Sequence, residues 1–172
     1  MTTIDQRFGA DILEHVKERY YGKYRGTVID VDAATLRIKA KVPAVQGGIE
    51  TGWCMPCVPY AGDGVGFAFL PEKEAGVWIE FEAGYTSQPV WVGCFWSAGQ
   101  IPPDATPTVK AIVTAKGAKL LFDDDAQTIT LTDGSNNKVT LSSHGITLER
   151  GANKVVVSDS NVSVNDGAME VM

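Results

Sequence analysis

The last third of the chain repeats with a step of eight residues. Lys138–Ser142 (KVTLS) aligns with Lys154–Ser158 (KVVVS), and Ile146–Gly151 aligns with Val162–Gly167. Alternate positions in each repeat are aliphatic or aromatic, which is the pattern of a short strand with one apolar face. This step is too short for a helical repeat or a propeller blade. It fits one strand plus one turn, as in a β-helix.

Each of these strands has only two apolar side chains. Burying each contributes about 1.5–3 kcal/mol, less than ordering eight residues at about 1–2 kcal/mol each. A single copy therefore leaves its apolar face open, whereas three copies around a common axis would bury it and pair strand edges between chains. We predict a homotrimer; a two-sheet monomeric appendage is the alternative. The predicted trimer core consists of Leu120, Phe122, Ile129, Leu131, Val139, Leu141, Ile146, Leu148, Val155, Val157, Val162 and Val164.

The chain before this repeat has a different composition. All four tryptophans and all eight prolines precede residue 108, and all five asparagines follow residue 135. Short apolar runs bounded by glycine or proline, without a helical pattern between them, predict a small closed or partly closed β-barrel. The expected strands are Gly26–Val31, Leu36–Val42, Trp53–Val58, Val65–Leu70, Val77–Phe81 and Val90–Phe95.

Two further segments flank the barrel. Apolar side chains recur about every four residues from Ile4 to Tyr21, which predicts a short helix that either lies across its own domain or docks on another protein. Three prolines within Ile101–Pro107 predict an extended, semi-rigid connector. We therefore divide the chain into a helical segment (1–23), a barrel (24–100), a linker (101–109) and a β-helix (110–172).

Charge and terminal sequence exclude several classes of function. The net charge is −6 and no cluster of lysine or arginine is present, which argues against a nucleic-acid partner. The sequence contains no run of about 18 apolar residues, so it predicts no membrane-spanning helix. The first residues lack the basic start and apolar core of a secretory signal, so we expect synthesis in the cytoplasm.

No residue pattern indicates catalysis, and we predict neither enzyme activity nor a cofactor. Cys54 and Cys57 have a zinc-like spacing, with Cys94 as a possible third ligand. Positions three apart on a strand face opposite sides, so we interpret all three as structural thiols. Asp123–Asp125 lacks the glycine and distal glutamate of a calcium loop and is interpreted as a solvated turn. His144 is expected at an exposed turn.

Several barrel motifs resemble a known family in their order along the chain. They are Arg25–Val28, Arg37–Pro43, Val77–Glu82 and Gln88–Gly93. This series resembles the OB-fold domain of phage baseplate central-spike proteins (baseplate assembly protein V) and of their VgrG relatives in type VI secretion and extracellular injection systems. The repeat resembles the triple-stranded β-helix that follows this domain in the family.

The resemblance implies an all-β fold: a short N-terminal helix, an OB-fold barrel and an intertwined, trimeric triple-stranded β-helix. It implies a structural spike in a phage tail or injection particle, held on a baseplate hub protein and touching the target envelope transiently as it punctures it. The hub-docking residues would be Ile4, Phe8, Leu13, Val16 and Tyr20. The tip, which in the family commonly receives a small separate PAAR-like protein, would be formed by Met169, Val171 and Met172, beside Val162 and Val164.

A different class of function remains open from the sequence. OB-folds also bind oligosaccharides and oligonucleotides, and the β-helix would then be a fibrous stalk. Trp53, Trp91 and Trp96 would in that case be exposed stacking platforms rather than core side chains. An enzyme with an unrecognised site is a third and weaker alternative, for which no residue is named.

Overall fold

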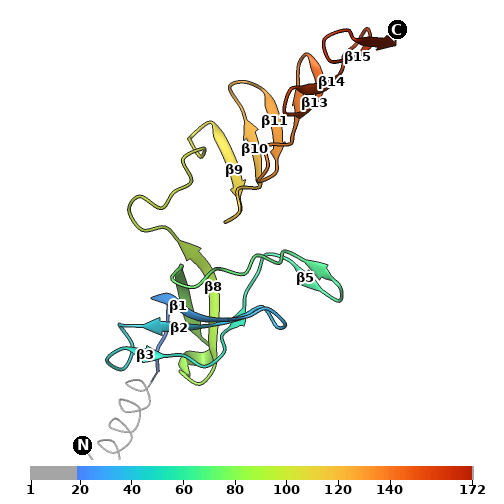
Figure 1. Ribbon diagram of the computed structural model, residues 1–172. Helices are drawn as coiled ribbons and strands as arrows, with labels where there is room; N and C mark the ends of the chain where they lie inside the picture. The colour runs from blue at the N-terminus through green and yellow to red at the C-terminus, as the bar shows by residue number, and fades with distance from the viewer. Residues whose placement is uncertain (1–18, 172) are drawn as a thin grey trace, which may run out of the picture. The chain divides into compact units, whose positions relative to one another are not determined.

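Figure 1 shows the computed structural model of the chain, which describes residues 19–171. The chain divides between Gly99 and Gln100 into two compact units, and each is described by itself. The helix predicted from Ile4 to Tyr21, with the docking residues Ile4, Phe8, Leu13 and Val16, lies outside the described residues apart from its last three positions.

The first unit is a six-stranded sheet that closes on itself. Strand order is β3-β2-β1-β7-β8-β4, antiparallel except for the parallel pair β4 and β8. The Cys54 amide, just before β4, donates a 2.8 Å hydrogen bond to the Ile38 carbonyl in β2, which closes the barrel. The strands are β1 (Tyr24–Asp32), β2 (Arg37–Val42), β3 (Ile49–Glu50), β4 (Met55–Pro56), β7 (Gly76–Phe81) and β8 (Pro89–Phe95), with a 3-10 turn at Glu82–Gly84.

Alternating residues and two bulges explain this curvature. In β2, Ile38, Ala40 and Val42 point into the barrel and basic residues alternate with them. One unpaired residue, Ile29, interrupts the β1–β2 register, and Val92 does the same between β7 and β8. Bulges increase local twist and bend a strand, so both help a short sheet to close.

The barrel contains all the buried apolar side chains of the described chain. One buried polar residue accompanies them: the Thr51 hydroxyl accepts a 2.9 Å hydrogen bond from the Ala40 amide. That bond satisfies a backbone donor that would otherwise be buried without a partner. The core residues are Val28, Ile38, Ala40, Val42, Val45, Cys54, Val77, Ile79, Phe81 and Trp91.

A hairpin arm, defined here as residues 60–69, projects from the barrel (Figure 1). Its two strands, β5 (Ala61–Gly62) and β6 (Val65–Gly66), pair only with each other. Val65–Leu70 was expected as a barrel strand, and this prediction is wrong: only Val65–Gly66 forms a strand, and it belongs to the arm. Gly66 has φ of +154°, and a Cβ there would lie 2.8 Å from the Tyr60 carbonyl, so the chain turns away at a position that only glycine fits.

The second unit is an eight-stranded antiparallel meander in which every strand pairs with its neighbours in sequence. The six repeats seen in the sequence correspond to β10–β15, and one further strand extends the sheet at each end. The strands are β9 (Val109–Val113), β10 (Lys119–Asp123), β11 (Thr128–Thr132), β12 (Lys138–Ser142), β13 (Gly145–Arg150), β14 (Asn153–Val157), β15 (Val162–Val164) and β16 (Met169–Val171).

This topology corrects one expectation about the trimer. Both hydrogen-bonding edges of each strand from β10 to β15 are occupied within the chain, so these strands do not pair with another copy. The cause is the eight-residue step, because a tight turn returns the chain beside the strand that it has just left. Across residues 19–171 of this sheet, only the outer edges of β9 and β16 lack a strand partner.

The proline-rich segment is folded into turns rather than extended. The Ala105 amide donates to the Pro102 carbonyl at 3.0 Å, and Thr106 and Val109 exchange backbone hydrogen bonds of 3.1 and 3.2 Å. Asp104 Oδ2 lies 2.6 Å from Lys119 Nζ in β10. The segment is therefore bound to the second unit. No helix within the described residues is long and apolar enough to cross a membrane.

Candidate assembly interface

The strand register of the second unit places its apolar side chains in two columns on one side of the sheet, here called the apolar face. Residues directly opposite each other on antiparallel strands share a side. The first column is Ile112, Leu120, Leu131, Val139, Leu148, Val155, Val164 and Met169. The second begins at Lys110 and continues with Phe122, Ile129, Leu141, Ile146, Val157, Val162 and Val171. All twelve residues predicted for the trimer core lie in these columns.

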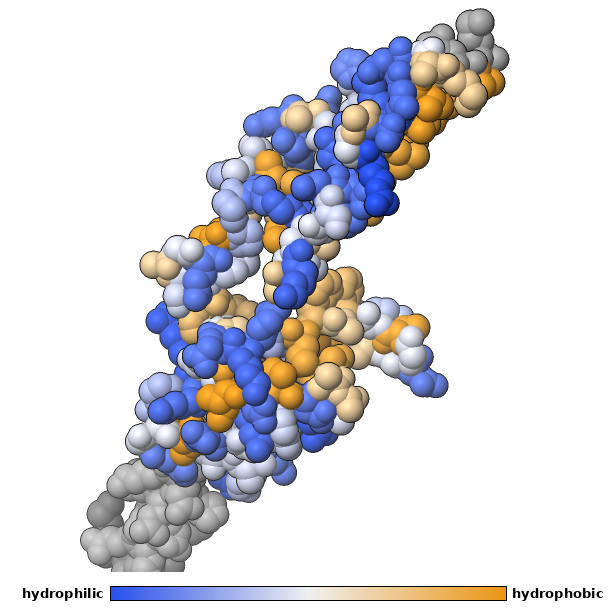
Figure 2. All heavy atoms as spheres, in the orientation of Figure 1, coloured by the Kyte–Doolittle hydropathy of each residue, from blue (hydrophilic) through white to orange (hydrophobic). Residues whose placement is uncertain are grey.

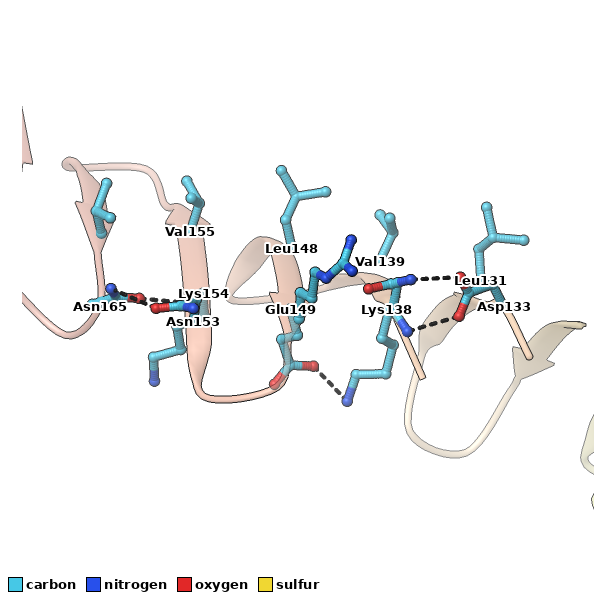
Figure 3. A pocket seen from close by; sticks show the side chains of 13 residues that line it. Leu131, Asp133, Lys138, Val139, Leu148, Glu149, Asn153, Lys154, Val155 and Asn165 are labelled. Atoms are coloured by element: carbon cyan, nitrogen blue, oxygen red, sulfur yellow. Dashed lines mark hydrogen bonds and ion pairs between the residues drawn. The ribbon is translucent and has the colours of Figure 1, made fainter. Parts of the chain in front are cut away.

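The apolar face is open in the single chain. No described residue after Gln100 is buried, and Leu131 is 55% and Leu148 46% exposed. Figure 3 shows Leu131, Val139, Leu148 and Val155 pointing to the same side, where they line a groove of about 570 Å³. Soluble monomers rarely expose a continuous apolar surface of this kind. The apolar face therefore has the composition of a protein core, although it is exposed in the single chain.

The opposite side of the same sheet is polar. Thr140 and Thr147 lie opposite each other in register, and Lys138 Nζ lies 2.6 Å from Glu149 Oε2. In Figure 3 the side chains of Lys138 and Glu149 point away from the leucine and valine side. Such half-exposed ion pairs contribute little to stability. This side is suited to water from β11 to β15 apart from Val156, whereas toward β9 it also has the apolar residues Leu121, Val109, Ala111 and Val113.

Polar side chains fix the tight turns between strands. Asp133 accepts hydrogen bonds from the Ser135 amide (2.8 Å), the Asn137 amide (2.8 Å) and Asn137 Nδ2 (2.5 Å). The Asn137 side chain, followed by the two amides, lowers the pKa of the Asp133 carboxyl. Farther along, Asn165 Oδ1 accepts from the Lys154 amide at 2.8 Å. Sequence reasoning missed these roles, although the concentration of asparagine in this region was the available signal.

Two polar motifs from the sequence are turns in the structure. Asp123 Oδ1 accepts from the Asp125 amide (3.1 Å) and the Ala126 amide (2.9 Å), and Asp124 forms an ion pair with Lys110. The acidic run is therefore the beginning of a turn between β10 and β11, as interpreted from the sequence. His144 is exposed in the turn between β12 and β13, as predicted.

The cysteines face different environments. Cys54 is buried in the barrel core with its Sγ 3.2 Å from Thr51 Oγ1, and burial raises the pKa of its thiol. Cys57, three positions along, is exposed, and so is Cys94. Within residues 19–171, no group of three histidine, cysteine, aspartate or glutamate side chains is arranged to hold a metal ion.

The aromatic residues proposed for ligand stacking do not form a common surface of exposed rings. Trp91 is only 5% exposed, and its Nε1 donates a 3.4 Å hydrogen bond to the Leu36 carbonyl, so the expectation of an exposed platform is wrong there. Pro89, two residues earlier on the same side of β8, is buried as well. Lys39 Nζ lies 4.7 Å from the ring centroid of Trp53. Trp96 is 65% exposed.

The remaining predicted site residues lie near the two ends of the described chain. Tyr20 packs edge-on against Tyr24 (6.1 Å between ring centroids) and Phe81 (6.3 Å), within its own barrel. Its role in docking stays a prediction. Met169 and Val171 in β16 are 60% and 59% exposed, and Met172 lies outside the described residues. The tip role of these residues also stays a prediction.

Comparison with protein families accounts for both units. Residues 24–96 match the type VI secretion system/phage-baseplate injector OB domain. Residues 110–170 match the phage baseplate V C-terminal trimerisation domain. The chain belongs to the phage baseplate V family. A comparison with the curated proteins gave no match.

Membership of the baseplate V family gives the two units their general roles. The closed barrel is the OB domain, and the open apolar face lies within the trimerisation domain. The resemblance seen in the sequence is confirmed, and so is the all-β fold class. The protein is a spike component of a phage baseplate or a type VI injector.

Proposed function

We propose that this baseplate V protein is a homotrimeric central spike that punctures the target envelope when its machine contracts. The observation that carries the proposal is the apolar face. It runs without interruption from Leu120 to Val171, it is open in one chain, and it coincides with the matched trimerisation domain. Three copies meeting along this face bury it and leave the threonine and lysine side in water.

Stiffness is the mechanical property that the proposal requires. Every interior strand of the meander is hydrogen-bonded to its own chain on both edges. In the proposed trimer, the three sheets would also be joined through a shared apolar core. Bending such a needle would break many backbone hydrogen bonds and core contacts together. Axial force is therefore carried to the C-terminal end rather than absorbed. In this role the protein acts without catalysing a reaction.

The other parts of the proposal concern assembly. The first 23 residues attach the barrel to a hub protein of the baseplate, and the β16 end receives a small separate tip protein. The chain is made in the cytoplasm and enters a phage tail or an injection particle there. Contact with the target envelope is transient and follows contraction.

The trimer is tested by comparing substitutions on the two sides of one strand. Leu148→Asp puts a charge on the apolar face of β13, whereas the control Thr147→Asp puts the same charge on its polar side. Sedimentation equilibrium should give a trimer for the wild type and Thr147→Asp but a monomer for Leu148→Asp, because three unpaired charges would be buried together. A monomeric wild-type chain at micromolar concentration would contradict the proposal.

Puncturing is tested in the producing bacterium. Particles made with Leu148→Asp should lack the spike and should not permeabilise target cells, whereas Thr147→Asp particles should remain active. Electron microscopy would show the spike, and dye entry into target cells would show puncture. Dye entry at the wild-type rate with spikeless particles would rule out this role.

A further inference from the structure

The arm of the barrel has an unusually apolar surface for an exposed loop. Tyr60, Val65, Phe67 and Phe69 are between 53% and 60% exposed, and the rings of Phe67 and Phe69 stack with centroids 6.4 Å apart. Asp63 at the turn is the only charged residue of the arm. An exposed surface with this many large apolar side chains is typical of a contact surface for another protein.

The barrel of the same chain does not cover this surface. β5 and β6 pair only with each other, and an isolated two-stranded hairpin is at best marginally stable in water. A hollow of about 420 Å³ separates the arm from the barrel, lined by Leu36 and Trp91 on the barrel and by Tyr60 and Phe69 on the arm. The arm therefore needs a surface from outside its own chain to be held in place.

In a trimer, the barrel of another copy is a surface that the arm could contact. β8 ends at Phe95 and the second unit begins at Gln100, so the connection spans at most about 18 Å. A unit of this size is roughly 30 Å across, from a radius of gyration of about 12 Å. Three barrels tied this closely to one trimerisation domain cannot avoid one another, and their effective concentration is at least millimolar.

Three-fold symmetry decides which kind of contact is possible. Around a three-fold axis identical side chains can meet only at the axis itself, as proposed for the apolar face, whereas away from the axis one surface of each chain meets a different surface of the next chain. An arm that packs on a neighbouring barrel makes a contact of the second kind. Trp96 is 65% exposed, more than the other exposed tryptophan, Trp53 (38%), and it directly follows β8 beside the short connection.

We propose that, in the trimer, the arm of each chain packs through Phe67 and Phe69 on the barrel of the next chain, at the surface marked by Trp96. This inference rests on the homotrimer proposed above. It adds a second contact between copies, formed by the OB domain rather than by the β-helix, and it gives the arm a function.

The test measures hydroxyl-radical labelling of side chains in the full-length chain. The wild-type trimer is compared with full-length Leu148→Asp, with a dosimeter peptide added to both samples. Phe67, Phe69 and Trp96 should be labelled at least threefold more slowly in the trimer than in the monomeric variant. Equal labelling of the arm in both proteins overturns the inference, and the arm is then free for a hub or another protein.

A double substitution tests the receiving surface. The double variant Phe67→Ser, Phe69→Ser should still sediment as a trimer, because the trimerisation domain holds the three copies together. The labelling rate of Trp96 should rise to the rate in the monomer. Tyr21→Ser, which removes another exposed ring from the same unit, should leave Trp96 protected. Continued protection of Trp96 in the double variant overturns its assignment. A monomeric wild type would overturn the homotrimer itself, whereas a trimer with a fully labelled arm overturns only this inference.

Discussion

The two units of this protein use the same kind of strand and reach opposite outcomes. In both, short antiparallel strands carry apolar residues on one side. The barrel buries ten apolar residues in its own core, whereas no described residue of the tail is buried. The difference is closure. The barrel sheet returns to itself where Cys54 meets Ile38, whereas the meander places each strand only beside the strands that precede and follow it in sequence.

Local register explains why one sheet closes and the other does not. Both long ladders of the barrel contain a bulge, at Ile29 and at Val92. The registers described for β9–β16 run without a shift, and the strands have three to six residues. Without bulges or long strands the sheet does not curl enough to cover itself. A self-sufficient fold therefore depends on where the strands bend as much as on their apolar content.

The largest effect is expected from truncating the apolar face of the tail. Leu131→Ala removes three side chains per trimer, at about 2–5 kcal/mol each. The dissociation constant of the trimer should rise by about 10⁴-fold or more, measured by sedimentation over a range of concentrations. The core of the barrel should stay folded, because Leu131 is not part of it. Thr130→Ala, on the polar side of β11, is the control and should change the constant less than tenfold.

A core substitution in the barrel should give a smaller effect that is independent of concentration. Ile79→Ala should lower the free energy of unfolding by about 2–5 kcal/mol, because Ile79 is fully buried. Tryptophan fluorescence during urea unfolding measures this, since all four indoles lie in the first unit. Glu80→Ala, which loses only an exposed ion pair with Lys23, serves as control. In the monomeric Leu148→Asp background, where contacts between barrels are absent, a midpoint that moved with protein concentration would contradict the self-sufficiency of the barrel.

The buried hydroxyl of the barrel should contribute less again. Thr51→Val keeps the size of the side chain but leaves the Ala40 amide without an acceptor, at a cost of about 1–3 kcal/mol. Thr51→Ser retains the hydroxyl and should recover most of the stability. Equal urea midpoints for the valine and serine variants would show that the hydrogen bond contributes nothing.

Acidification should slightly lower the folding stability of both units, because each contains an aspartate whose pKa is lowered. Hydrogen bonds from Thr35 and Ala34 lower the pKa of Asp32 in the barrel, and those described above lower that of Asp133 in the tail. A lowered pKa means that the folded state binds the proton less readily than the unfolded state, whose value is about 3.9. The stabilisation is thus complete above about pH 4 and is lost as pH falls through the lowered pKa. Melting temperatures of the wild type and Asp133→Asn at pH 6 and pH 3 would measure the tail contribution, and the loss on acidification should be smaller in the variant.

Much of this fold was predictable because apolar periodicity and register agree. The repeat predicted the strands from β10 to β15, and the structure places all twelve expected core residues on one side. In the barrel, alternation predicted β1, β2, β7 and β8. The closure argument also anticipated that the tail would have no buried core of its own.

The missed features have identifiable physical causes. Two-residue strands such as β3 and β5 are too short to show a period. Val65–Leu70 reads as a strand because it is apolar, but the conformation of Gly66 separates its two halves. Strand pairing between chains was expected because the backbone N–H and C=O groups at strand edges need hydrogen-bond partners. The turns satisfy those edges within the chain instead, which no count of apolar residues reveals.

The uninterrupted register of the meander also determines how such a needle changes length. Two strands and their turns use sixteen residues and return the chain to the same side of the sheet, with both columns in phase. Neighbouring strands lie about 4.8 Å apart, so each sixteen-residue unit adds roughly 10 Å. Duplication or deletion of one unit would alter reach while keeping both apolar columns in phase. The length of the second unit therefore changes only in steps of one sixteen-residue unit, and a point substitution leaves it unchanged.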